Sequence, residues 1–268
     1  MRMTAGSAAG LLAASVLLLG ACGGMREPEQ LAAKPSPSPA AKTTARAPLA
    51  PSPLRPLVFG RVVTTQPIVA LTFDCCQTQK PAGFDEPLVR YLIRNHVPAT
   101  FMLGGRWIET HPDAVKLLAS TPFFELGNHS YIHPHMTKQT PAQMRQELVR
   151  TQELLHKSTG RYATAFRPPY GEWDKRVVAE AAKAGMRTVM WSVATGDPDP
   201  HVSAAGIVAE VRKVKPGGVI IMHANGRGWH TAKALPNVLA WLKKKGLKPV
   251  TVSELLKAGS PVSLEARK

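Results

Sequence analysis

The chain has 268 residues, a formal net charge of +16 and 44% hydrophobic residues. This length and apolar content are enough for one well-buried domain of about 200 residues, and the basic excess favours an anionic partner. Nucleic acid is not the expected partner, because the chain carries an export signal and shows neither an aromatic-rich RNA-binding motif nor zinc-finger spacing. An anionic cell envelope fits the charge better.

The N-terminus predicts export and a lipid anchor. Arg2 begins a basic region, residues 11–19 form a short apolar core, and the segment Leu-Gly-Ala-Cys that ends at Cys22 resembles the bacterial lipoprotein box. We expect a signal peptide over residues 1–21, lipid attachment at Cys22, and a membrane-anchored protein on the periplasmic or cell-surface side. The alternative is an ordinary secretory signal in which Cys22 is incidental.

The rest of the chain divides into a tether and a folded domain. Residues 22–57 are rich in Pro, Ala and Ser and cannot build a core, which predicts an extended, semi-stiff tether. Residues 58–268 are expected to form a single domain. No feature of the sequence indicates its oligomeric state, and a monomer is assumed.

The domain alternates expected strands and helices. Strands are expected at residues 67–73, 99–103, 123–127, 163–167, 187–193, 219–222 and 248–252, and helices at residues 87–95, 113–119, 141–158, 174–185, 203–214, 235–245 and after Ser253. Single helices between strands imply right-handed crossovers and a parallel sheet. Six or seven such units in about 200 residues favour a small, incomplete (β/α) barrel.

Two histidines form the most informative local pattern. His129 and His133 are four residues apart, so both rings can converge on one ion. No Glu follows His129, which excludes the His-Glu-x-x-His metalloprotease pattern, and Pro134 prevents a continuing helix. The pair is therefore expected on a loop or a single turn. The alternative is two histidines that only form hydrogen bonds.

Ionisable residues follow several of the expected strands. They are Asp74, His129, Arg167, Asp197 and His223, each just beyond the carboxyl end of a different strand. Because these ends converge at the mouth of a barrel, the five side chains are expected to form one cluster.

The order of these motifs resembles that of a known family. The motifs are Thr72-Phe-Asp74, the segment from His129 to His133, Arg167-Pro-Pro-Tyr-Gly171, Trp191 with Asp197, and Ile221-Met-His223. In this order they are similar to the five motifs of the polysaccharide deacetylase family, which is carbohydrate esterase family 4 with the NodB-homology domain. The resemblance covers nearly all of residues 67–255. It implies a distorted (β/α)₇ barrel of parallel strands, and a metal-dependent hydrolase that removes acetyl groups from N-acetylated sugars.

The resemblance also implies a role for each matching residue. His129 and His133 would hold a divalent metal, which polarises the acetamide carbonyl. Asp74 would act as the general base and Arg167 would keep it ionised. The remaining roles are the oxyanion donor, from the backbone N–H of Tyr170; the general acid, His223, oriented by Asp197; and two sugar-stacking walls, Trp191 and Trp229.

The chain departs from the family at Cys75, where a second aspartate usually completes a His, His, Asp metal site. A thiolate is a good zinc ligand, so Cys75 could be the third ligand of a zinc site, with cobalt or nickel as alternatives. It could equally be a small buried hydrophobic residue, which is the commoner role of a free cysteine. Adjacent Cys75 and Cys76 could pair only through a strained ring.

The glycan is not identified by the sequence: peptidoglycan, poly-N-acetylglucosamine and chitin oligomers all fit. Two alternative functions share most of these residues. One is an inactive glycan-binding lipoprotein, and the other is an esterase that removes O-acetyl groups with the same site. An acid and a base on opposite sides of a carbonyl favour the enzyme, because a binding module has no use for them.

Overall fold

The computed structural model describes residues 51–77 and 82–265, so the expected signal peptide, Cys22 and the tether as far as residue 50 lie outside the described residues. The strands are β1 (Val58–Val63), β2 (Ile68–Cys75), β3 (Ala99–Leu103), β4 (Phe124–Asn128), β5 (Ala165–Phe166), β6 (Arg187–Val189), β7 (Val193–Ala194), β8 (Val219–His223), β9 (Lys248–Val250) and β10 (Ser260–Ser263). The helices are α1 (Glu86–Arg94), α2 (Gly105–Thr110), α3 (Pro112–Ser120), α4 (Pro141–Thr159), α5 (Lys175–Lys183), α6 (Ala204–Val211), α7 (Thr231–Lys244) and α8 (Val252–Lys257), with 3₁₀ turns η1 (Met136–Lys138) and η2 (Pro169–Gly171).

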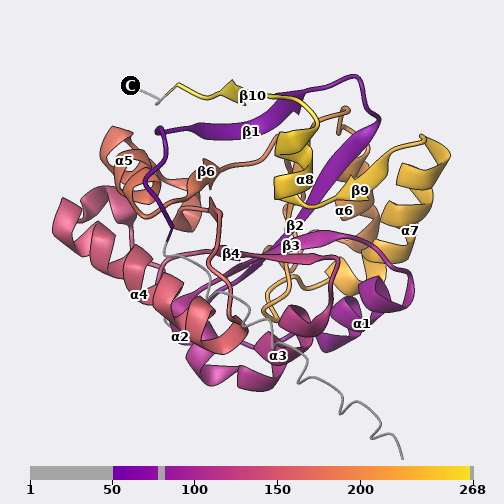
Figure 1. Cartoon of the computed structure of the whole chain (residues 1–268). Helices are drawn as coiled ribbons and strands as arrows, with labels where there is room; N and C mark the ends of the chain where they lie inside the picture. Colours follow the sequence, from indigo (N-terminus) through magenta and orange to yellow (C-terminus); the bar gives the residue numbers. More distant parts are fainter. Residues whose placement is uncertain (1–50, 78–81, 266–268) are drawn as a thin grey trace, which may run out of the picture. The chain divides into compact units, whose positions relative to one another are not determined.

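Strand β2 is an interior strand of the sheet, between β3 and β8 (Figure 1). All of its residues are buried, as the uncharged, largely apolar run at residues 67–73 predicts for a strand covered on both faces. It pairs in parallel with β3 over residues 72–75, with β8 over residues 70–74 and with β9 over residues 68–70. The strand order β10-β1-β6-β5-β4-β3-β2-β8-β7 is parallel throughout except between β1 and β10.

Residues 187–194 bring the two sides of this sheet together. β6 pairs with β5 and β1, whereas β7, only three residues later, pairs with β8. Between them Met190 N–H donates to Phe59 O (2.7 Å) and Ser192 N–H to Val219 O (2.9 Å). One stretch of chain therefore borders both β5 and β8, which curls the sheet into a distorted barrel. The strand expected at 187–193 is interrupted because it changes partners there.

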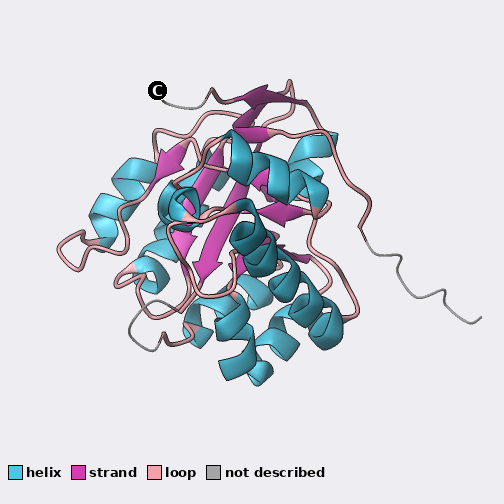
Figure 2. Cartoon of the chain, turned by 90° about the vertical axis from the view of Figure 1, so that its left-hand side faces the viewer, coloured by secondary structure: helices cyan, strands magenta, loops and turns pink. Residues whose placement is uncertain are grey.

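The two faces of β2 have different surroundings. Val69, Leu71 and Phe73 belong to the larger apolar cluster, which includes residues of the surrounding helices, whereas Ile68 and Ala70 belong to a smaller cluster inside the curled sheet. Figure 2 shows the helices packed around the central strands. This alternation decides which residues at the end of β2 can reach the functional site.

Local signals place most helix starts correctly. Thr140 and Gln143 form a capping box at the start of α4, and Asp174 and Ser203 cap α5 and α6 through their side chains. Helix α2 was not expected, because the Gly104-Gly105 pair reads as the end of a strand; Gly104 is instead the residue that precedes the helix.

The described end of the expected tether lies against the domain. The backbone N–H of Leu54 donates to Ala182 O at 2.8 Å, and that of Thr188 donates to Leu57 O at 3.0 Å. Strands β1 and β10 were also not expected, and their pairing is the only antiparallel pairing between named strands in the described residues. No helix in the described part of the chain is both long and apolar enough to span a membrane.

Candidate active site

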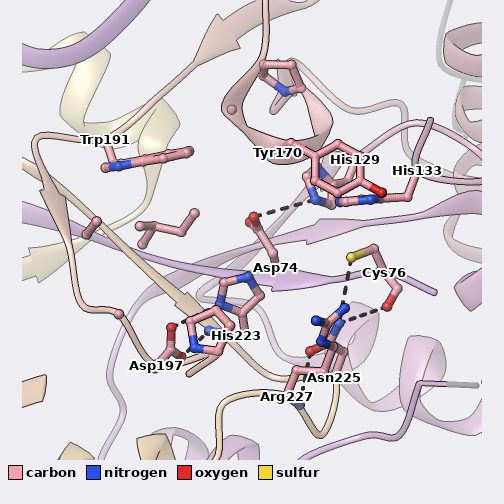
Figure 3. Close-up of a pocket in the computed structure, with 16 residues that line it drawn as sticks. Asp74, Cys76, His129, His133, Tyr170, Trp191, Asp197, His223, Asn225 and Arg227 are labelled. Carbon is pink, nitrogen blue, oxygen red and sulfur yellow. Dashed lines mark hydrogen bonds and ion pairs between the residues drawn. The ribbon is translucent and has the colours of Figure 1, made fainter. Parts of the chain in front are cut away.

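A pocket of about 310 Å³ opens at the carboxyl ends of the strands. The pocket brings together seven of the side chains singled out from the sequence, namely Asp74, His129, His133, Tyr170, Trp191, Asp197 and His223 (Figure 3). Cys76, Asn225 and Arg227 also line it. The ionisable residues expected at the strand ends therefore do lie together. The volume of the pocket is at the lower end of the range for small-molecule pockets, about 300–1,000 Å³.

Asp74 is held by a buried arginine. Arg167 is completely buried, and its Nη1 donates to Asp74 Oδ1 at 2.7 Å while Nη2 donates to Thr72 Oγ1 at 2.8 Å. Burial by itself would raise the pKa of Asp74, but the neighbouring charge of Arg167 lowers it below its usual value. Asp74 is therefore ionised at neutral pH. Arg167 binds only Oδ1 of this carboxylate, so that Oδ2 of Asp74 faces His129 in the pocket.

The two histidines lie on the loop after β4, as expected. The Nδ1–H of His129 donates to Arg167 O at 2.7 Å, which directs Nε2 into the pocket, 3.5 Å from Asp74 Oδ2. Ser130 and His133 have positive φ angles of 63° and 61°. Left-handed backbone costs of order 1–3 kcal/mol at such residues and is concentrated at functional sites. The strain lets both rings turn to the same side of the loop.

Both rings are uncharged at neutral pH. Burial lowers the pKa of His129, and the negative charge of Asp74 only partly offsets this effect. Burial and the neighbouring His129 lower the pKa of His133 to about 3. The Nδ1 atom of His133 is buried and has no hydrogen-bond partner in the described structure. Neutral rings, one with an unpartnered buried nitrogen, are suited to binding a cation.

The third member of this group is Cys76, which was not singled out from the sequence as a ligand. One ligand atom each from Cys76, His129 and His133 lie within 4.8 Å of one another, a group that could hold a metal ion. The Cys75 side chain is fully buried in the larger apolar cluster with Phe73. Because side chains alternate along a strand, Cys75 points away from the face that carries Asp74. This burial favours the interpretation of Cys75 as a small buried hydrophobic residue over that of a metal ligand.

Asp197 and His223 form a second pair across the pocket. The Nδ1–H of His223 donates to Asp197 Oδ1 at 3.0 Å, and the His223 backbone N–H donates to Asp197 Oδ2 at 2.7 Å. The hydroxyls of Thr195 and Thr231 also donate to this carboxylate, at 3.1 and 2.6 Å. Burial would lower the pKa of His223, but the hydrogen bond to Asp197 and its charge raise it above its usual value. His223 therefore keeps its proton to higher pH than an ordinary histidine.

The aromatic residues occupy different places. Trp191 lines the pocket and lies beside Arg167, whose Cζ is 5.7 Å from its ring centroid. Tyr170 lines the pocket with its side chain half exposed, and it lies in η2 with a φ of 58°. Trp229 is 58% exposed and is not among the residues that line this pocket; its backbone N–H donates to Asp197 O.

Several residues of the site were missed from the sequence. Thr72 holds Arg167, Thr195 and Thr231 hold Asp197, and Asn225 contacts Cys76. Alternation places Cys76 and Thr72, each two residues from Asp74, on the same side of the chain as Asp74, but it does not say which side faces the histidines. The others follow only from tertiary contacts.

Comparisons with known proteins agree with this geometry. Residues 61–189 match the family model described as polysaccharide deacetylase. A peptidoglycan-N-acetylglucosamine deacetylase of Bacillus cereus is 35% identical over 191 residues, which are 70% of this chain and 67% of that protein. The chain spans about half, or less, of the length of several other curated relatives that it matches.

Solved structures share the fold. A family 4 carbohydrate esterase of Streptomyces lividans in complex with acetate has a TM-score of 0.64 and 31% identity, and the match covers 76% of this chain and all of that one. A carbohydrate esterase family 4 pseudoenzyme of Bacillus anthracis has a TM-score of 0.68 and 30% identity, over 76% of this chain and 70% of that one. The expected distorted (β/α)₇ barrel is thereby confirmed, and the chain belongs to the polysaccharide deacetylase family, carbohydrate esterase family 4.

Proposed function

We propose that this protein hydrolyses N-acetyl groups of an N-acetylated cell-envelope polysaccharide, with a divalent metal held by His129 and His133. The observation that carries the proposal is that one pocket contains both an ionised carboxylate and a protonated histidine. Asp74 is held ionised by Arg167, and His223 is held protonated by Asp197. An amide hydrolase needs both, a base for the attacking water and an acid for the leaving amine.

The metal, which we propose to be zinc, would polarise the acetamide carbonyl and make an attacking water more acidic. Asp74 accepts the proton of this water at Oδ2, since Arg167 occupies Oδ1. The water oxygen bonds to the carbonyl carbon, and the backbone N–H of Tyr170 stabilises the negative charge on the carbonyl oxygen. His223 then donates its proton to the nitrogen as the C–N bond breaks, which releases acetate and leaves a free amine on the sugar.

The glycan would be bound at the mouth of the pocket. Trp191 lines the pocket, and Trp229 is exposed on the loop that follows His223. Both are proposed to stack on sugar rings. The relative from B. cereus acts, by its name, on N-acetylglucosamine of peptidoglycan, which makes peptidoglycan the first substrate to test. The lipid on Cys22 would hold the enzyme at the membrane beside this polymer.

A second candidate function is an inactive glycan-binding protein. It is favoured by the similarity to the B. anthracis pseudoenzyme and by the missing second aspartate of the family. The retained pairs Asp74–Arg167 and Asp197–His223 oppose it, because binding alone requires neither.

The test is acetate release from peptidoglycan, poly-N-acetylglucosamine and chitin oligomers, measured with and without a chelator and again after zinc is restored. An O-acetylated glycan assayed in parallel distinguishes the esterase alternative. Chelator-sensitive release from at least one N-acetylated polymer is expected. No release by folded, zinc-loaded protein would reject the enzyme in favour of the binding protein.

A further inference from the structure

We infer that Cys76 is the third protein ligand of the metal site, so that a thiolate and two imidazoles make it selective for soft ions such as zinc or cobalt. The inference rests on the metal site of the proposed function. It concerns the residue that follows Cys75, and Cys75 is the position at which the chain departs from the aspartate that is usual in the family. Replacing carboxylate oxygen by sulfur shifts the preference of a site away from magnesium, calcium and manganese.

The sulfur of Cys76 lies close to both histidines. The Sγ atom and one ring nitrogen each of His129 and His133 lie within 4.8 Å of one another. Cys76 is 4% exposed and lines the pocket, and Figure 3 shows its sulfur between the two histidine rings above and Asn225 below. Small side-chain rotations would bring the three atoms to the bond lengths of about 2.0–2.3 Å that zinc requires.

The direction of β2 places Cys75 away from the histidines. Asp74 and Cys76 lie on one side of the chain, and Cys75 lies on the other, in the apolar cluster with Leu71 and Phe73. To bring the Cys75 sulfur to the histidines, the end of β2 would have to turn over. This would break the pairing of Cys75 with Leu103 and the bond from Gly104 N–H to Cys75 O (2.9 Å). Only one of the two adjacent thiols can therefore serve the site.

Asn225 positions Cys76. Its Nδ2 donates to Cys76 O at 2.8 Å and lies 3.7 Å from Cys76 Sγ, within hydrogen-bond range of a sulfur acceptor. Asn225 is itself 1% exposed, and its Oδ1 accepts from the Arg227 backbone N–H at 3.3 Å. Such a donor fixes a thiolate and tunes its bond to a metal, and loss of this kind of partner typically costs about 10–100-fold in affinity.

The adjacent cysteines supply a matched pair of variants, Cys76→Ala and Cys75→Ala. The readout is the near-ultraviolet sulfur-to-cobalt charge-transfer band of the cobalt-loaded protein, together with zinc affinity from competition with a chelating indicator. Wild type and Cys75→Ala should both show the band and bind zinc equally. Cys76→Ala should lose the band and at least about 10–100-fold of its zinc affinity, since a ligand counts for no less than a supporting residue.

Thermal unfolding of each metal-free variant verifies that it is folded. Should Cys75→Ala not fold, Cys75→Val provides the same comparison. A band that persists in Cys76→Ala, that disappears only in Cys75→Ala, or that is absent from cobalt-treated wild type overturns the inference.

Asn225→Ala tests the positioning role by the same two measurements. The charge-transfer band should remain, because the sulfur is still present, while zinc affinity falls by about 10–100-fold. Unchanged zinc affinity would reject the role of Asn225.

These measurements use no substrate. If the cobalt band contradicts Cys76 while acetate release stays chelator-sensitive, the ligand assignment alone fails. If the band behaves as expected but no polymer is deacetylated, the proposed function fails and the ligand assignment stands.

Discussion

Asp74 and His223 lie directly opposite each other in the register of β2 and β8. Parallel strands are about 4.8 Å apart, so the two groups face the same pocket from neighbouring strands. Burial opposes the charged form of each, and their main partners Arg167 and Asp197 overcome this. Asp74 and His223 also stabilise each other's charged form, because Asp74 raises the pKa of His223 and His223 lowers that of Asp74. The pair therefore carries one ionised and one protonated group at the same pH.

Asp74→Asn should abolish most activity while retaining the shape of the site. The amide oxygen can still accept from Arg167, but it cannot take a proton from water, and general-base catalysis contributes about 10²–10⁴-fold. We expect acetate release to fall by this factor, with zinc affinity within a few-fold of wild type. Activity within about tenfold of wild type would show that another residue is the base.

The buried Asp74–Arg167 pair should be costly to break and less costly to replace. Arg167→Met leaves a buried carboxylate without its charge partner, and we expect the free energy of unfolding to fall by about 3–5 kcal/mol. The double variant Asp74→Leu/Arg167→Met removes both charges and should be more stable than Arg167→Met alone, although inactive. Chemical denaturation of the metal-free proteins measures both. A double variant less stable than the single one would mean that packing, and not charge, dominates at this position.

Asp197→Asn should narrow the pH range of activity from the basic side. His223 must be protonated to donate to the amine, and the hydrogen bond to Asp197 and its charge raise its pKa against the opposing effect of burial. Without that charge the pKa of His223 falls, so the basic limb of kcat/KM against pH should move to lower pH. The acidic limb, which reports the base, should move much less. A basic limb at the wild-type position would assign it to a group other than His223.

Cys22→Ser tests the lipid anchor, which lies outside the described residues. The variant should appear in the soluble fraction of cells, whereas the wild type should sediment with membranes. Serine has no sulfur atom to which the lipid could be attached. Cys75→Ser serves as the control for general effects of losing a thiol. Membrane association that survives in Cys22→Ser would remove Cys22 as the anchor.

The sequence by itself determined the β/α alternation, most helix starts and the residue types at the strand ends. These features are local: an apolar run predicts β2, and side chains such as Thr140 and Asp174 satisfy the first backbone N–H groups of their own helices. The convergence of Asp74 and His223 also follows, because the carboxyl ends of parallel strands meet at one edge.

Only the tertiary structure decided how this edge is closed and which cysteine faces it. Residues 187–194 change partners from β5 to β8, a pairing between distant segments that no local pattern encodes. Alternation along β2 relates Cys76 to Asp74 but does not say which side faces the histidines. That follows from the packing of Cys75 beneath the helices and from the long-range contact of Asn225 with Cys76. Cys75 and Cys76 have the same side chain, and they differ only in the burial and the contacts that the whole fold gives to each.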